Sequence, residues 1–156
     1  MRSILAQEFM VKRLITLRPE MDVMDAVKLL LKYRISGAPV VDSRGKFLGV
    51  FSEKCCMHII LDAAYDSLPT NHVEAFMDRD AQTCRPDTDL LSIAQVFLLT
   101  SRRRLPVVDE HGMLLGQVSR RDVLRVSMQE LERPLQHQSS VLYLSALADS
   151  DSSHIA

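Results

Sequence analysis

Two residues in the second half of the chain, Ser119 and Asp122, have the types and spacing of a polar site at the start of a helix. A helix N-terminus carries unpaired amide groups that suit a phosphate, and a carboxylate can accept hydrogen bonds from two neighbouring hydroxyls. The same spacing also makes a capping box, in which the serine bonds the first turn and the aspartate reaches back. Local sequence alone favours the cap, and a binding role stays open.

Six arginines lie close to this pair in the sequence. Between Arg102 and Arg125 they outnumber three acidic residues, which leaves a local charge of +3. They are Arg102, Arg103, Arg104, Arg120, Arg121 and Arg125. Guanidinium groups bind phosphate through paired hydrogen bonds, so phosphate contact is one interpretation. A solvated helix face and a contact between two copies of the chain are the alternatives.

Other polar residues do not form a typical catalytic or metal-binding pattern. Asp42 and Asp109 each open a glycine-containing turn, which explains them without acid–base chemistry. Cys55, Cys56 and His58 are close in sequence, but we expect a helix with two small buried thiols there. No nucleophile–base–acid set or glycine-rich phosphate loop is visible. We therefore predict that the chain is not an enzyme and binds no metal.

The composition predicts one globular domain, or two small halves packed as one. The 156 residues are 47% hydrophobic and 25% charged, and the net charge is −1. No aromatics alternate with the arginines, so we expect no nucleic-acid surface. Without an apolar run of about eighteen residues we expect no membrane insertion, and we see no signal peptide. Three cysteines without disulfide spacing predict a cytoplasmic protein.

The elements that position the polar residues belong to a gapless internal repeat. Residues 9–60 recur as residues 76–127, so equivalent positions differ by 67. Identical pairs include Phe9/Phe76, Met10/Met77, Thr16/Thr83, Pro19/Pro86, Pro39/Pro106, Gly45/Gly112, Gly49/Gly116 and Ser52/Ser119. Two copies predict one compact unit in which each copy covers a face of the other.

The sequence pattern of each copy predicts the element order β-α-β-β-α. The fold class is therefore α/β (α+β), with the two copies related by a pseudo-twofold axis. A proline ends the first extended segment, an aspartate caps the first helix, a proline opens the second strand, a glycine forms the hairpin turn and a serine caps the last helix. These residues are Pro19, Asp22, Pro39, Gly45 and Ser52, then Pro86, Asp89, Pro106, Gly112 and Ser119. The first helices are predicted over 23–33 and 90–101, and the last helices end near residues 64 and 131.

Three parts are expected along the chain. Residues 1–68 form the first domain with its entry helix, residues 69–133 the second domain, and residues 134–156 a C-terminal tail. The tail is rich in Gln and Ser, then in Ser and Asp, so we expect it to be partly disordered or docked through its apolar patch, Val141 to Leu147.

The ordered motifs of the two copies resemble a known family. They read Gly37-Ala38-Pro39-Val40-Val41-Asp42 with Gly49-Val50-Phe51-Ser52, and Leu105-Pro106-Val107-Val108-Asp109 with Gly116-Gln117-Val118-Ser119 and Asp122. This set, occurring twice, resembles the tandem CBS-domain family, or Bateman module, over about residues 5–130. The resemblance implies two copies packed through their sheets, with two clefts that commonly bind adenosyl ligands, and pairing into a flat dimer.

The resemblance also implies roles for individual residues. Asp122 matches the acid that accepts hydrogen bonds from both ribose hydroxyls, and Ser119 matches the hydroxyl that faces phosphate. The ligand-binding positions of the second copy are Thr83, Cys84, Arg85, Arg104, Leu105, Pro106, Ser119, Arg121 and Asp122. In the first copy Cys55 replaces the acid, and a thiol is a weak acceptor. The weaker candidates of that copy are Thr16, Ala38, Pro39 and Ser52.

We therefore expect a stand-alone regulatory module that binds AMP, ADP or ATP in the second cleft and needs no other cofactor. We expect a homodimer that signals to a regulated enzyme or transporter. The sequence does not separate these nucleotides from S-adenosylmethionine. The alternative is a dimerisation scaffold with vestigial clefts, which the missing acid at Cys55 favours and the intact Ser119 and Asp122 oppose.

Overall fold

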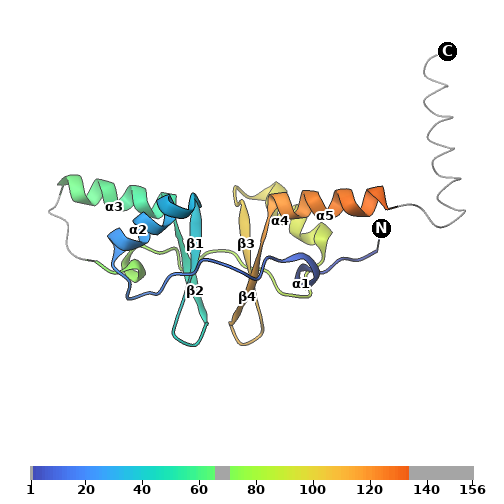
Figure 1. The fold of residues 1–156 in the computed structure, drawn as a ribbon, viewed down its shortest axis with the longest axis horizontal. Helices are drawn as coiled ribbons and strands as arrows, with labels where there is room; N and C mark the ends of the chain where they lie inside the picture. Colours follow the sequence, from blue (N-terminus) through green and yellow to red (C-terminus); the bar gives the residue numbers. More distant parts are fainter. Residues whose placement is uncertain (1, 66–70, 134–156) are drawn as a thin grey trace, which may run out of the picture. The chain divides into compact units, whose positions relative to one another are not determined.

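The computed structural model describes residues 2–65 and 71–133 (Figure 1). The elements are α1 (Ala6–Phe9), α2 (Val23–Tyr33), β1 (Gly37–Val41), β2 (Phe47–Ser52), α3 (Glu53–Tyr65), the 3₁₀ turn η1 (Val73–Ala75), α4 (Leu90–Leu99), β3 (Arg104–Val108), β4 (Leu114–Ser119) and α5 (Arg120–Glu132). Helices and two small antiparallel sheets, β1–β2 and β3–β4, confirm the predicted fold class. The sheets and the pockets described below lie within residues 2–124, which belong to one compact unit.

The two copies fold alike from the hairpin to the last helix. The strands β1 and β2 and the helix α3 have the same lengths as β3, β4 and α5, and each begins 67 positions earlier. Both sheets also shift register at the equivalent point, between Val40 and Val41 and between Val107 and Val108. The sequence repeat is therefore a structural repeat.

Both predicted aspartate caps are confirmed. Asp22 Oδ1 accepts a hydrogen bond from the amide of Met24, and Asp89 Oδ1 accepts one from the amide of Ser92. The second of these helices, α4, ends two residues before the predicted position 101. The reason is Thr100, whose backbone is extended and whose hydroxyl donates to the carbonyl of Val96 at 2.7 Å.

The strands differ from the prediction in two ways. The opening strand of each copy is reduced to one parallel bridge, Leu17 with Val40 and Cys84 with Val107. The prediction that a proline begins the next strand is wrong, because Pro39 is the third residue of β1. Proline is tolerated there since the bridge to Leu17 uses the Pro39 carbonyl and the Val41 amide, and leaves the proline nitrogen out.

The hairpin turns follow the prediction. Gly45 and Gly112 have φ angles of 86° and 80°, the left-handed region that favours glycine. Asp42 Oδ1 accepts from the amides of Arg44 and Lys46, and these bonds hold the pKa of the Asp42 carboxyl below its usual range. Asp109 has the equivalent bonds. Both aspartates are therefore turn residues.

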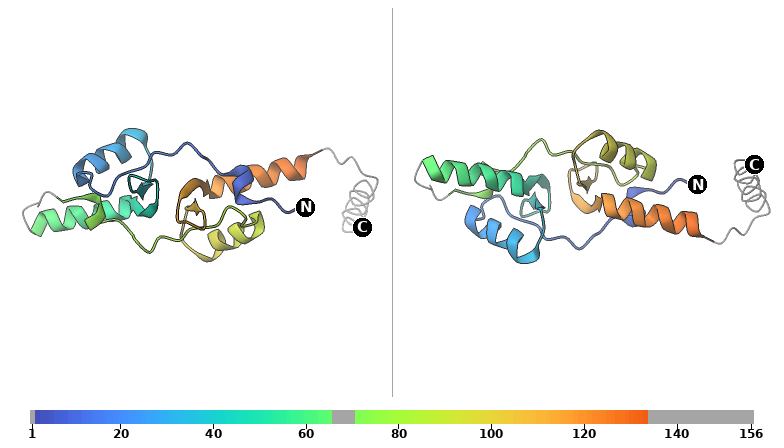
Figure 2. Two further views of the ribbon diagram at one scale, coloured as in Figure 1. Left: turned by 90° about the horizontal axis from the view of Figure 1, so that it is seen from below. Right: turned by 90° about the horizontal axis from the view of Figure 1, so that it is seen from above.

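The segment that precedes each copy packs on the other copy (Figure 2). The amides of Ala6 and Gln7, in the entry helix, donate to the carbonyls of Thr88 and Pro86 in the second copy. Conversely, the amide of Val73, which precedes the second copy, donates a hydrogen bond to the carbonyl of Met21 in the first copy. The entry helix, which we grouped with the first copy by sequence, is therefore bonded to the second.

The same exchange continues along the sheets. Val11 exchanges two backbone hydrogen bonds with Gln117 of β4, and Asp78 exchanges two with Val50 of β2. Each sheet thus gains a bridge from the segment that leads into the other copy. Because each entry segment pairs with the sheet of the other copy, residues from both copies can line one cleft.

Some sequence predictions fall on residues that the structure does not describe. The tail at 134–156, with its apolar patch from Val141 to Leu147, lies outside the described residues. Among the helices that the structure does describe, none combines the length and apolar character needed to cross a bilayer.

Candidate functional site

Ser119 and Asp122 form a capping box at the start of α5. Asp122 Oδ2 accepts hydrogen bonds from the amide and the hydroxyl of Ser119, both at 2.8 Å. The Ser119 hydroxyl in turn accepts from the Asp122 amide at 3.1 Å. These bonds fix both side chains at the helix N-terminus, and both line a cavity of about 300 Å³.

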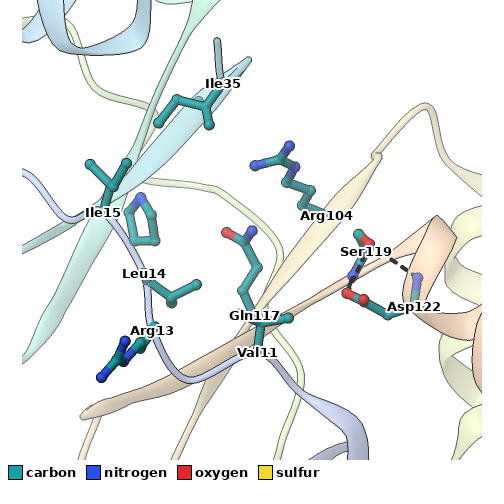
Figure 3. Close-up of a pocket in the computed structure, with 11 residues that line it drawn as sticks. Val11, Arg13, Leu14, Ile15, Ile35, Arg104, Gln117, Ser119 and Asp122 are labelled. Carbon is teal, nitrogen blue, oxygen red and sulfur yellow. Dashed lines mark hydrogen bonds between the residues drawn. The ribbon is translucent and has the colours of Figure 1, made fainter. Parts of the chain in front are cut away.

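We call this cavity the Asp122 cleft (Figure 3). One wall comes from the first copy and the segment leading into it, the other from β3, β4 and α5 of the second copy. Its lining residues are Val11, Arg13, Leu14, Ile15, Ile35, Gly37, Pro39, Arg104, Gln117, Ser119 and Asp122. Figure 3 shows the apolar side chains of Leu14, Ile15 and Ile35 across the cleft from the Ser119–Asp122 pair.

A second cavity, of about 340 Å³, lies at the pseudo-equivalent place, and we call it the Ser52 cleft. Its lining residues are Ser36, Gly37, Val50, Ser52, Glu53, Lys54, Ala81, Gln82, Ser101, Arg102, Arg103, Arg104, Pro106 and Gln117. Gly37, Arg104 and Gln117 line both clefts. The two clefts therefore adjoin.

The cap of the Ser52 cleft is a weaker version of the first. The Ser52 hydroxyl lies 3.4 Å from both the amide and the Sγ atom of Cys55. The Cys55 thiol also lies 3.8 Å from the carbonyl of Val50, which it can reach only as a donor. A thiol there cannot accept from a diol as a carboxylate can.

The six arginines have different places in the structure, and only some of them line a cleft. Arg120 donates from its guanidinium to the carbonyls of Arg102, Phe97 and Thr100, so it closes the end of α4. Arg102 contacts the Asp78 carboxylate at 3.4 Å. Arg121 and Arg125 are exposed and line neither cleft. The arginine triplet 102–104 lines the Ser52 cleft, and only Arg104 also reaches the Asp122 cleft.

Comparison with known proteins gives the family. The sequence profile of the CBS domain matches residues 6–62 and 73–129. The chain belongs to the CBS-domain family. The two sequence copies are its two CBS repeats.

Similar proteins fall in the same family. The chain is 29% identical to CBSX2 of Arabidopsis thaliana, crystallised in complex with AMP, over 82% of this chain and 98% of that one, with a TM-score of 0.73. It is 25% identical to the CBS domain pair of protein MJ0100, crystallised with 5-methylthioadenosine and S-adenosyl-L-methionine, over 83% and 99%, with a TM-score of 0.66.

The curated relatives include a longer enzyme. The chain is 30% identical over 120 residues to inosine-5'-monophosphate dehydrogenase of Methanocaldococcus jannaschii, which is 77% of this chain and 23% of the dehydrogenase. The chain thus spans less than a quarter of that enzyme.

The structure brings together only part of the predicted site. Arg104, Ser119 and Asp122 share the Asp122 cleft, and Pro39, a candidate of the first CBS repeat, lies there with them. Pro106 and Ser52 share the other cleft. Five residues of the second repeat and one of the first line neither: Thr83, Cys84, Arg85, Leu105, Arg121 and Ala38. Thr16 lines a smaller hollow, which shares Leu14 with the Asp122 cleft.

The sequence reasoning missed the apolar wall at Leu14, Ile15 and Ile35. These residues precede or follow the motifs that were matched, and they belong to the other repeat from Asp122. A signal was present at Gly49 and Gly116, where a glycine recurs at the point that the crossing backbone approaches.

None of the three cysteines is among the lining residues of the two clefts. Cys55, Cys56 and Cys84 are buried free thiols, as expected for the first two. Burial raises the pKa of Cys84 to about 11, so its thiol stays protonated near neutral pH. Across residues 2–65 and 71–133, His, Cys, Asp and Glu side chains do not gather in any group of three that could hold a metal ion.

Proposed function

We propose that the chain binds an adenosyl nucleotide of the AMP, ADP or ATP class in the Asp122 cleft, and that a partner protein senses this binding. The observation that carries the proposal is the position of the Ser119–Asp122 pair opposite an apolar wall in one cavity. A nucleoside needs both features, because its base is flat and largely apolar and its ribose carries two neighbouring hydroxyls.

Each part of the cleft suits one part of the ligand. The Asp122 carboxylate accepts hydrogen bonds from Ser119, and a carboxylate, with two oxygens, can also accept from the two hydroxyls of a diol. Leu14, Ile15 and Ile35 offer the surface for adenine. Arg104 offers a fork of donors for a phosphate. The AMP complex of CBSX2 supports a nucleotide of this class for a related CBS pair.

Binding in this cleft has a route to a signal. The lining comes from both CBS repeats, so a ligand bound there would bias the contact between the repeats. We propose that the chain forms a homodimer, since α2 and α4 expose large apolar side chains, and that a regulated enzyme or transporter reads the dimer. The three free cysteines without disulfide pairing favour a reducing compartment such as the cytoplasm.

A second candidate is a dimerisation scaffold that binds no ligand. The capping box favours it, because Asp122 already has a structural partner in Ser119. Calorimetric titration of ligand-free protein with AMP, ADP, ATP and S-adenosylmethionine separates the two candidates. Saturable binding of one molecule per chain supports the nucleotide module, and no binding of any of the four supports the scaffold.

A further inference from the structure

The Ser52 cleft differs from the Asp122 cleft in both features that would hold a nucleoside. Cys55 stands where the Asp122 cleft has its aspartate. The three apolar side chains of the wall, Leu14, Ile15 and Ile35, correspond to the smaller Ala81 and the polar Gln82 and Arg102 in the Ser52 cleft, as the 67-residue offset shows. The residues proposed to contact adenine and ribose in the Asp122 cleft are therefore replaced in the Ser52 cleft.

The same cleft has gained positive charge. Its lining contains four basic side chains, Lys54, Arg102, Arg103 and Arg104, and one acidic side chain, Glu53. Part of this charge is already balanced, since Arg102 contacts Asp78. The cleft is open to solvent, so its charges act on small anions from solution but are partly screened by salt.

We propose that the Ser52 cleft binds an inorganic oligophosphate rather than a nucleoside. Several adjacent phosphoryl groups match several guanidinium and ammonium groups better than one phosphate does, because each cation then has its own oxygen acceptors. The cavity of about 340 Å³ has room for such a chain. This inference concerns the Ser52 cleft and does not depend on the nucleotide proposed for the Asp122 cleft.

Two residues test this cleft without disturbing the other. Lys54 and Arg103 line the Ser52 cleft and not the Asp122 cleft, and both are exposed, so Lys54→Gln and Arg103→Gln should leave the fold intact. Arg104 is unsuitable because it lines both clefts. Arg44→Gln is the matched control, since Arg44 is an exposed arginine in the β1–β2 turn and lines neither cleft.

The experiment is calorimetric titration of the full chain with sodium tripolyphosphate, without divalent cations, at about 0.1 M salt. We expect one saturable binding event that Asp122→Asn and Arg44→Gln leave unchanged. Loss of one charge-assisted contact should weaken binding by about tenfold or more in Lys54→Gln and in Arg103→Gln.

Three results would overturn the proposal. They are no binding of tripolyphosphate, equal binding by the wild type and both cleft variants, and binding of sulfate as tight as that of tripolyphosphate. A parallel titration with AMP, in the wild type and in Asp122→Asn, reports on the Asp122 cleft. Failure of AMP to bind with success of tripolyphosphate would remove the proposed function and leave this inference standing. AMP binding that Asp122→Asn weakens, with no binding of tripolyphosphate, would do the opposite.

Discussion

Gly49 lies so close to Asp78 that a Cβ atom added to the glycine would be 2.5 Å from the Asp78 carbonyl oxygen. The neighbouring residue, Val50, exchanges two backbone hydrogen bonds with Asp78, at 3.0 and 2.8 Å. The second CBS repeat is thus fastened to the sheet of the first at a point where no side chain fits. Gly116 has the equivalent place, since a Cβ atom added to it would lie 2.8 Å from the Val11 carbonyl oxygen.

Gly49→Ala should therefore destabilise the fold. The obstructing atom is backbone, which cannot rotate away, so we expect a cost typical of overpacking, about 1–3 kcal/mol. Urea unfolding followed by circular dichroism measures the cost. Ser43→Ala, in an exposed turn, is the control and should change stability by less than about 0.5 kcal/mol. Equal stability of Gly49→Ala and wild type would contradict the close approach.

The sequence predicted the elements of each repeat well, for local reasons. Asp22 and Asp89 begin helices through bonds to their own first turns, and Gly45 and Gly112 form turns through their own φ angles. The clefts depend on something else, namely which repeat each entry segment packs against. The 67-residue offset identifies equivalent residues but does not say that Ile15 faces Asp122 across a cavity.

The homodimer has a direct test. Leu31 on α2 and Leu98 on α4 occupy equivalent positions and are 73% and 83% exposed. Burying them against a second copy would stabilise the pair by the hydrophobic effect. Light scattering at tens of micromolar should give twice the chain mass of 17.7 kDa, and Leu98→Glu should shift it toward one chain.

Ser43→Glu is the control for this shift, because it adds the same charge in an exposed hairpin turn. It should leave the mass unchanged. A wild type that scatters only as a single chain would contradict the homodimer.

Alkaline pH should destabilise the fold partly through Cys84. Burial raises the pKa of this thiol from 9.0 to about 11. Between these values the unfolded chain loses the proton while the folded chain keeps it, so the free energy of unfolding falls as pH rises from about 9 to about 11. Urea midpoints at pH 8 and pH 10.5 measure the fall.

Cys84→Ala isolates the contribution of this thiol to the pH dependence. The variant should be less stable at every pH, since Cys84 is buried, but its midpoint should fall less steeply than that of the wild type between pH 9 and pH 11. If the urea midpoints of the two proteins fell equally steeply with pH, the pKa of the Cys84 thiol would be the same in the folded and unfolded chain.

Restoring the missing acid should not restore a nucleotide site. Cys55→Asp returns a carboxylate to the Ser52 cleft, but Gln82 and Arg102 still stand where the Asp122 cleft has Ile15 and Ile35 to contact a base. Calorimetric titration with AMP should therefore still give one event per chain, with circular dichroism as the check that the variant folds. A second event of similar affinity would show that the missing carboxylate alone had prevented nucleotide binding in the Ser52 cleft.

The most direct test of the nucleotide proposal is the affinity of AMP for the wild type and for Asp122→Asn. Asparagine keeps the size of the side chain and much of its capping ability but removes the charge. A hydrogen bond to a charged group contributes about 1.5–3 kcal/mol, so calorimetry should show binding weakened by about ten- to a hundredfold. Unchanged affinity in a folded Asp122→Asn variant would mean that the aspartate is only a helix cap, and would contradict its proposed role in the cleft.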